Sequence, residues 1–483
     1  MYNTISVGPE LAAFTTGNRF TGMKQLSEYY RMPDPWVQFS CDNGDAEETG
    51  YFTFGKDSIC FGRCSSVPVA RTLKQPMPDT FKYAHVGKNS VHLPFNLDDV
   101  ACNLHNERYA LAESASRMQK FIRNAYYRVR PGLAVRVRKY LQRVYLSGWK
   151  SIPHPSWPID RSVDQLMERA LGLGIKASGV NSLPFIWFWP DGHNSSCIVT
   201  HDVETEAGRN FCSTLMDLDD SCGMKSAFQI VPEVRYEVPA AFLAGIRSRG
   251  FEVNVHDLNH DGMLFADEKT FMERVGAINR YGKQFGASGF RSGSLYRNQE
   301  WFHALDFEYD MSVPNVAHLE PQRGGCCTVM PYFIGNLVEL PLTTTQDYTL
   351  FNILGERSIS MWERDIDAVH RNHGLISILV HPDYILEPWA QEIYLQLLRH
   401  IAGKASKENI WLATPGEVNN WWRIRSKLSL TRDDGSWKII GDGCQRARIA
   451  YASLDGDNLR YSFDPPVKPM AEAGSGESLS SSA

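Results

Sequence analysis

Apolar runs alternate with helical stretches from residue 183 to residue 428, and this alternation constrains the fold more than any other feature of the chain. Regular alternation of this kind indicates parallel strands with helices packed outside, as an open sheet or a barrel. In such barrels the chemistry collects at the carboxyl ends of the strands. The expected strands are 197–200, 226–231, 251–255, 287–290, 308–312, 337–340, 375–380 and 410–412, and the expected helices are 209–222, 239–249, 269–285, 357–373 and 389–402.

Two histidines follow one of these strands as an H-x-x-x-H pair, His256 and His260. If the turn after the strand is helical, this spacing puts both rings on one side, where they can share a divalent ion. The neighbouring acids Asp257 and Asp261 are expected to orient the rings. An isolated pair of this spacing would usually be surface or core histidine, but its position after a strand end favours a metal site.

Two carboxylates, Asp202 and Glu204, follow another strand, and strand alternation puts both on one face. Such a pair can divide the work of hydrolysis, because one carboxylate binds a metal while the other accepts a proton from the metal's water. The alternative is a helix N-cap and a solvated acid. Together with the two histidines, these acids form the minimum set of side chains that metal-assisted hydrolysis requires.

Three more polar residues come at or after strand ends: Arg291, Asp310 and His381. Arg291 can pin a carboxylate with forked hydrogen bonds and keep it ionised; alternatively it is a surface arginine. His381 ends the apolar run 375–380, where it could donate a proton to a leaving amine; alternatively it is a satisfied core histidine.

These five segments, in this order, resemble the motifs of the polysaccharide deacetylase family, also called the NodB-homology family, over roughly residues 184–422. The resemblance implies an α/β fold, a distorted (β/α) barrel, that removes N-acetyl or related acyl groups from amino sugars with one divalent metal. It implies Zn as the ion, with Co, Ni or Fe as alternatives. The implied roles are Asp202 as base, Arg291 as the residue that orients it, His381 as acid, Asp310 as a further catalytic residue, and Glu204, His256 and His260 as metal ligands.

The match to the family motifs is incomplete in three places. Val203 stands where the family's first motif has a second Asp, so the motif follows a D-x-D variant with Glu204 in the third position. The reverse assignment, with Asp202 on the metal, stays open. Only Arg291 remains of the third motif, and Asp310 is followed by Met311 where the family has Trp.

The predicted function is therefore a metal-dependent hydrolase that deacylates amino-sugar units of a polysaccharide or a lipid-linked glycan. One alternative is a small-molecule linear-amide or formamide hydrolase on the same scaffold. The other is a non-catalytic member that binds glycan without turnover.

Composition excludes some other classes. The net charge of −5 gives no argument for nucleic acid binding. No apolar run approaches the length of a membrane span, and the N-terminus lacks the pattern of a secretory signal, so a cytoplasmic location is expected. Ten cysteines show no disulfide framework or zinc-ribbon spacing.

A basic segment, residues 117–150, contains no acid. Leu133, Val137, Leu141 and Val144 recur in it at helical spacing. A basic amphipathic helix can lie on an anionic membrane at the inner face; the alternative is a helix packed on a neighbouring domain. The expected organisation is a mixed domain at 1–112, a basic helical connector at 113–182, the barrel at 183–428, a small β appendage at 429–464 and a disordered tail at 465–483.

Overall fold

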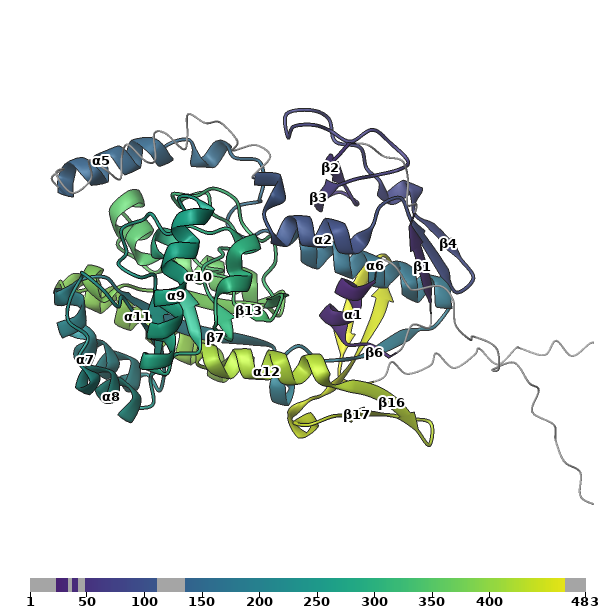
Figure 1. The fold of residues 1–483 in the computed structure, drawn as a ribbon. Helices are drawn as coiled ribbons and strands as arrows, with labels where there is room; N and C mark the ends of the chain where they lie inside the picture. The colour runs from purple at the N-terminus through teal and green to yellow at the C-terminus, as the bar shows by residue number, and fades with distance from the viewer. Residues whose placement is uncertain (1–22, 34–36, 42–47, 111–134, 465–483) are drawn as a thin grey trace, which may run out of the picture.

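The computed structural model describes residues 23–33, 37–41, 48–110 and 135–464 (Figure 1). A nine-stranded sheet forms its centre, in the order β12-β13-β11-β10-β9-β8-β7-β14, with β15 also paired to β7. Every pairing in it is parallel except that of β12 with β13. The strands are β7 Ser195–Val203, β8 Ala227–Ile230, β9 Glu252–His256, β10 Gly289–Arg291, β11 Tyr309–Asp310, β12 Tyr332–Ile334, β13 Leu337–Glu339, β14 Leu375–Leu379 and β15 Ile410–Leu412.

The sheet curls but does not close, so the expected barrel is realised only in part. Among the described strands, β14 pairs with β7 alone. Two threonine side chains occupy its other edge: the hydroxyls of Thr343 and Thr344 donate to the carbonyls of Leu375 and Ser377, each at 2.7 Å. These side chains satisfy backbone groups that a further strand would otherwise pair, and they leave the barrel open at this point.

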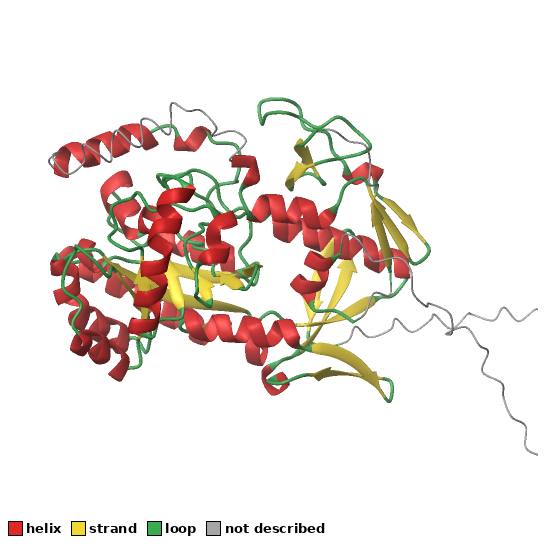
Figure 2. Ribbon diagram, in the orientation of Figure 1, coloured by secondary structure: helices red, strands yellow, loops and turns green. Residues whose placement is uncertain are grey.

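Helices pack around the sheet (Figure 2). Several of them begin at a side chain that caps the helix. Thr205 and Asp267 each accept a hydrogen bond from the backbone N–H three residues on, and Thr414 forms a capping box with Glu417. The helices are α7 Glu206–Ser221, α8 Ala240–Ser248, α9 Glu268–Phe285, α10 Ser360–His370, α11 Pro388–Glu408 and α12 Pro415–Lys427.

The N-terminal part combines two small sheets with three helices. Strands β1, β5 and β4 form one sheet, and β2 and β3 form the other. Their apolar side chains join those of the central sheet in one continuous core. The elements are α1 Lys24–Tyr30, β1 Gln38–Cys41, β2 Gly50–Thr53, β3 Ile59–Gly62, β4 His85–Gly87, β5 Ser90–Leu93, α2 Leu97–His105 and α6 Ser162–Ser178.

A buried ion pair joins this N-terminal part to the central sheet's loops. Arg297 donates to both carboxylate oxygens of Glu107, with Nε at 2.7 Å from Oε2. Nearby, the hydroxyl of Tyr109 donates to the carbonyl of Gly325 at 2.6 Å. These contacts hold the two parts in a fixed relation.

The C-terminal strands do not stand apart from the rest of the molecule. β18 (Ile449–Asp455) pairs antiparallel with β6 (Ser182–Ile186), the strand that precedes the central sheet in the sequence. β18 also pairs with β19 (Asn458–Ser462), while β16 (Ser429–Asp433) and β17 (Ser436–Ile440) form a hairpin.

Of the basic segment, the structure describes the helix α5 (Val135–Leu146) and the residues that follow it. The part of the segment before residue 135 and the predicted tail lie outside the described residues. α5 lies beside the π-helical turn η7 (Thr349–Leu354). Lys139 and Arg143 of α5 both donate to Asn352, to its side-chain and backbone oxygens at 2.6 and 2.8 Å. The predicted packing against a neighbouring domain therefore describes one side of this helix.

Candidate active site

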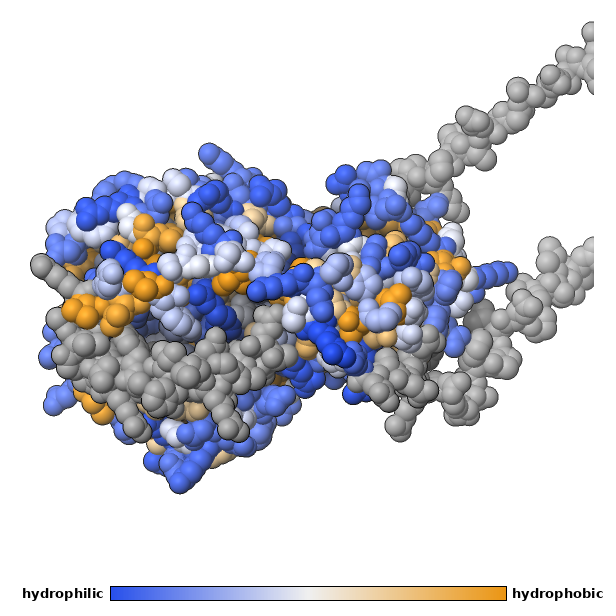
Figure 3. All heavy atoms as spheres, turned by 90° about the horizontal axis from the view of Figure 1, so that it is seen from above, coloured by the Kyte–Doolittle hydropathy of each residue, from blue (hydrophilic) through white to orange (hydrophobic). Residues whose placement is uncertain are grey.

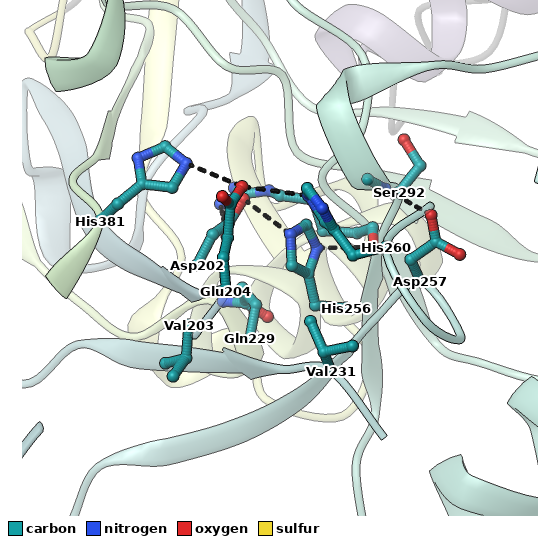
Figure 4. Close-up of polar contacts among 12 residues, drawn as sticks. Asp202, Val203, Glu204, Gln229, Val231, His256, Asp257, His260, Ser292 and His381 are labelled. Atoms are coloured by element: carbon teal, nitrogen blue, oxygen red, sulfur yellow. Dashed lines mark hydrogen bonds and ion pairs between the residues drawn. The ribbon is translucent and has the colours of Figure 1, made fainter. Parts of the chain in front are cut away.

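Asp202 and Glu204 lie at the carboxyl end of β7, where strand alternation turns both carboxylates toward the same space (Figure 4). The guanidinium of Arg291, at the end of β10, is fully buried. Its Nη1 donates to Asp202 Oδ1 at 2.9 Å and to Thr200 Oγ1 at 2.8 Å, and its Nε donates to the Met311 carbonyl at 2.9 Å. Arg291 is therefore held from three sides and fixes the Asp202 carboxylate.

His256 ends β9, and a non-helical loop carries the chain on to His260. The turn is not helical, so the condition under which the spacing would place both rings on one side is not met. Asp257 and His260 have φ of 56° and 54°, in the left-handed region. This backbone bends sharply and brings the two rings to 4.8 Å between centroids. H-x-x-x-H spacing places the rings together here through two strained residues rather than through helical geometry.

The neighbouring acids do not orient the rings. Asp257 accepts from the backbone N–H groups of Leu258 and Gly293, at 2.6 and 3.2 Å, and Asp261 accepts two hydrogen bonds from Arg274, both at 2.8 Å. That part of the prediction is wrong, because both carboxylates are engaged in holding the loop.

Other groups orient the rings instead. Nδ1 of His256 lies 3.1 Å from the Arg291 carbonyl, which can only accept, so this nitrogen carries the proton and Nε2 keeps a free lone pair. At His260, Nη2 of Arg235 lies 3.1 Å from Nδ1. Because a guanidinium can only donate, His260 would have to release Arg235 to bind an ion through Nε2.

The two histidines and Glu204 fit a metal ion. Nε2 of His256 and Nε2 of His260 are buried without a well-formed hydrogen bond. One ligand atom from each of the three residues lies within 4.8 Å of the others, and no other such cluster occurs in the described parts of the chain. Nε2 of His260 is 3.0 Å from Glu204 Oε1. Two imidazoles and one carboxylate that leave a position open form a donor set typical of a catalytic divalent metal.

His381 approaches the same carboxylates from the opposite side (Figure 4). It follows β14, and its Nε2 lies 3.8 Å from Glu204 Oε1. Asp347 holds it through two hydrogen bonds, from the ring Nδ1 to Oδ1 at 2.7 Å and from the backbone N–H to Oδ2 at 2.8 Å. The ring is therefore fixed with its Nε2 facing the site.

Asp347 is a site residue that the sequence interpretation missed. It lies eight residues beyond the end of β13, in Thr343-Thr344-Thr345-Gln346-Asp347. An acid soon after a short apolar run was the available signal. Asp310, expected to be catalytic, accepts from the Ser312 backbone and hydroxyl, both at 2.8 Å, and stands opposite Glu339 in the sheet register.

The surroundings of the site shift the pKa values of its two carboxylates and of His381 in opposite directions. Burial alone would raise the pKa values of Asp202 and Glu204, but neighbouring groups outweigh it and hold both below their usual range: Arg291 acts on Asp202, and His260 acts on Glu204. Burial would lower the pKa of His381, but Asp347 and Glu204 outweigh it and raise it to about 10. An ionised carboxylate and a protonated imidazole thus face one space at neutral pH.

Comparison with solved structures finds neighbours among the polysaccharide deacetylases, at low identity and over about half of this chain. A Mycobacterium smegmatis protein assigned to the polysaccharide deacetylases is 16% identical, with a TM-score of 0.39, covering 52% of this chain and 98% of that one. PuuE allantoinase is 14% identical with a TM-score of 0.39, covering 49% and 92%. A family 4 acetyl xylan esterase from Clostridium thermocellum, solved with a cobalt ion, is 14% identical with a TM-score of 0.32, covering 47% and 91%.

No protein-family model matches the chain, and no curated protein sequence does. What this chain does is therefore inferred from its own side chains.

Proposed function

We propose that the chain is a metal-dependent hydrolase that removes N-acetyl or related acyl groups from amino-sugar units of a polysaccharide or a lipid-linked glycan. One observation carries the proposal: the candidate metal ligands Glu204, His256 and His260 share one space with an arginine-held carboxylate, Asp202, and a carboxylate-held histidine, His381. Such a pair suits the hydrolysis of an amide, because the carboxylate can take a proton from the attacking water while the histidine gives one to the leaving nitrogen.

Each side chain has a distinct part in this reaction. A divalent ion on Glu204, His256 and His260 would polarise the attacking water and the amide carbonyl. Asp202, kept ionised by Arg291, takes the proton from the water. His381, kept protonated by Asp347, gives a proton to the departing amine. The ion on this site is proposed to be Zn, with Co, Ni or Fe as alternatives.

Metal content tests the site directly. We expect the purified protein to hold about one divalent ion per chain and a His256→Ala/His260→Ala variant to hold none, since that variant removes two of three ligands. Glu204→Gln should weaken retention. Elemental mass spectrometry measures all three.

A His85→Ala/His303→Ala variant is the matched control, because it removes two exposed histidines that are not among the candidate metal ligands. It should keep the metal. Metal retained by the His256→Ala/His260→Ala variant, or absent from the parent after reconstitution, would contradict the assignment.

Acetate release from a panel of acetylated amino sugars, set beside small linear amides, then separates deacetylation from small-molecule amide hydrolysis and from binding without turnover.

We also propose that α5 rests on an anionic membrane and thereby brings the site toward lipid-linked glycans. Val137, Leu141 and Val144, spaced as one helix face, are between 42% and 54% exposed. Figure 3 looks onto the side that carries α5, and an apolar patch is visible there on a largely hydrophilic surface. The helix has four basic residues and no acid, which suits an anionic surface. No helix among the described residues is long and apolar enough to span a bilayer.

Vesicle flotation tests this contact. We expect the protein to float with vesicles containing phosphatidylserine and not with neutral vesicles, and flotation to weaken as salt screens the charges. A Leu141→Glu/Val144→Glu variant should remain at the bottom of the gradient. Val234→Glu, at an exposed loop position outside α5, should float like the parent. Equal behaviour of the two variants would rule out α5 as the contact.

A further inference from the structure

A small cavity lies beyond the carboxyl edge of the sheet, outside the candidate metal site. The chain after β11 and the chain after β13 run side by side there, linked by a parallel bridge between Pro314 and Leu342. Trp157 and Pro158, which precede the central sheet in the sequence, also line the cavity. Its volume of about 30 Å³ suits one or two waters or a single hydroxymethyl group.

The first polar group in its wall is His318, a buried imidazole with unmet hydrogen-bonding capacity. His318 is 2% exposed, and neither ring nitrogen has a well-formed hydrogen bond. Burial lowers its pKa to about 4, against the opposing effect of the Pro155 carbonyl. A neutral imidazole offers one donor and one acceptor, and buried groups of this kind are normally satisfied. The Pro155 carbonyl can satisfy only the ring N–H, so the acceptor nitrogen is left for a donor that enters the cavity.

The second polar group, Glu320, connects the cavity to the candidate active site. Its carboxylate, 7% exposed, accepts from Gln346 Nε2 at 2.6 Å. Gln346 lies between Thr345, which lines the cavity, and Asp347, which holds His381. Three consecutive residues thus link the cavity wall to the carboxylate that holds the candidate acid. Burial raises the pKa of Glu320, and His381 is near enough for its charge to oppose that effect.

An aromatic surface completes the cavity. Trp157 is half-buried, and its ring lies 5.2 Å from that of Trp149 between centroids. No lysine or arginine lines the cavity, which disfavours a phosphate or another anion. A flat aromatic ring beside a neutral imidazole and a carboxylate suits a pyranose, whose C–H face can pack on the ring while its hydroxyls bond to the polar groups.

We propose that Trp157, His318 and Glu320 form a subsite for a second, neutral sugar unit, next to the unit that carries the acyl group. The cavity is too small for a whole ring, so the hydroxymethyl group enters it and the ring packs on Trp157. The subsite rests on the proposed function, and it makes the segment before the central sheet part of glycan recognition.

Binding of N-acetylglucosamine oligomers of one, two and four units tests the subsite. Isothermal titration would use the full-length, metal-loaded Asp202→Asn protein, so that no turnover occurs. We expect the two longer oligomers to bind at least tenfold more tightly than the monomer. Trp157→Ala and His318→Ala should each lower the affinity for the longer oligomers about tenfold, which is about the effect of losing one aromatic contact. Both variants should leave the affinity for the monomer unchanged.

Two variants control the experiment. Trp437→Ala removes a tryptophan of the β16–β17 hairpin and should keep the full gain with length. Trp157→Phe keeps an aromatic face and should keep most of it, which separates a lost platform from a misfolded variant. A gain that survives both Trp157→Ala and His318→Ala would overturn the subsite.

Acetate release by the unmodified enzyme separates this inference from the proposed function. Acetate release with no gain in affinity with length overturns the subsite alone. A gain that depends on Trp157, without acetate release from these oligomers or any other acylated amino sugar, supports the subsite and overturns the deacetylase. Neither binding nor acetate release overturns both.

Discussion

Replacing Asp202 with Asn should lower turnover by about 10²–10⁴-fold, the usual effect of removing a general base, and leave one metal ion per chain. The carboxylate is the group that Arg291 holds ionised at 2.9 Å, and an amide of the same shape cannot take a proton from water. Acetate release, measured beside metal content on the same preparation, checks both parts of the expectation.

The metal content separates the two carboxylates. His256 Nε2 lies 3.6 Å from Asp202 Oδ2, and His260 Nε2 lies 3.0 Å from Glu204 Oε1. If Asp202→Asn loses the metal and Glu204→Gln keeps it, the roles are reversed. Unchanged turnover in Asp202→Asn would remove the base assignment.

Asp310→Asn is the informative comparison for this variant. The resemblance implied a catalytic part for Asp310, but its carboxylate bonds to Ser312 and faces Glu339. We expect Asp310→Asn to change turnover far less than Asp202→Asn does. An equal loss would return Asp310 to the catalytic set.

The site residues at strand ends were predictable from the sequence, because side chains alternate between the two faces along a strand. Alternation along β7 put Asp202 and Glu204 on one face, and both do turn toward the candidate metal site. The apolar runs before His256 and His381 placed each at the carboxyl edge of a parallel sheet. The order of strands in the sheet did not follow from these runs, and neither did the open edge at β14, where threonine hydroxyls replace a neighbouring strand.

The site residues in loops were not predictable in this way, because loops have no repeating pattern of apolar and polar residues. The loop between His256 and His260 depends on two residues in left-handed conformation, and nothing in the spacing of the histidines distinguishes it from a helical turn. Asp347 and Trp157 lie in connecting segments, and only the folded chain brings them to His381 and to the cavity. Tertiary contacts decide such positions, so local pattern could not find them.

Asp347→Asn should move the alkaline limb of the kcat/KM profile to lower pH and reduce kcat/KM at neutral pH by about 10–100-fold, the usual effect of losing a residue that orients another. Asp347 is a principal reason that the pKa of His381 reaches about 10 against the effect of burial. Without that carboxylate the imidazole loses its proton at lower pH, and less of the enzyme carries the acid. A pH–rate profile of the parent and the variant measures the shift.

The same pair affects folding, with a definite sign. The folded pKa of His381, about 10, lies above the unfolded value of about 6.5. The pair's contribution to the free energy of unfolding is therefore complete below about pH 6.5 and is lost as the pH rises toward 10. Asp347→Asn should lower thermal stability at pH 6 more than at pH 10.

His381→Gln separates the acid from its partner. It should have low activity with no alkaline limb, whereas Asp347→Asn keeps a limb that has moved, because the imidazole is still present. An unmoved limb in Asp347→Asn would show that another group gives the proton to the leaving amine. Tyr384 would be the next candidate, since its hydroxyl donates to Glu204 Oε2 at 3.4 Å and its ring lies 5.0 Å from that of His381.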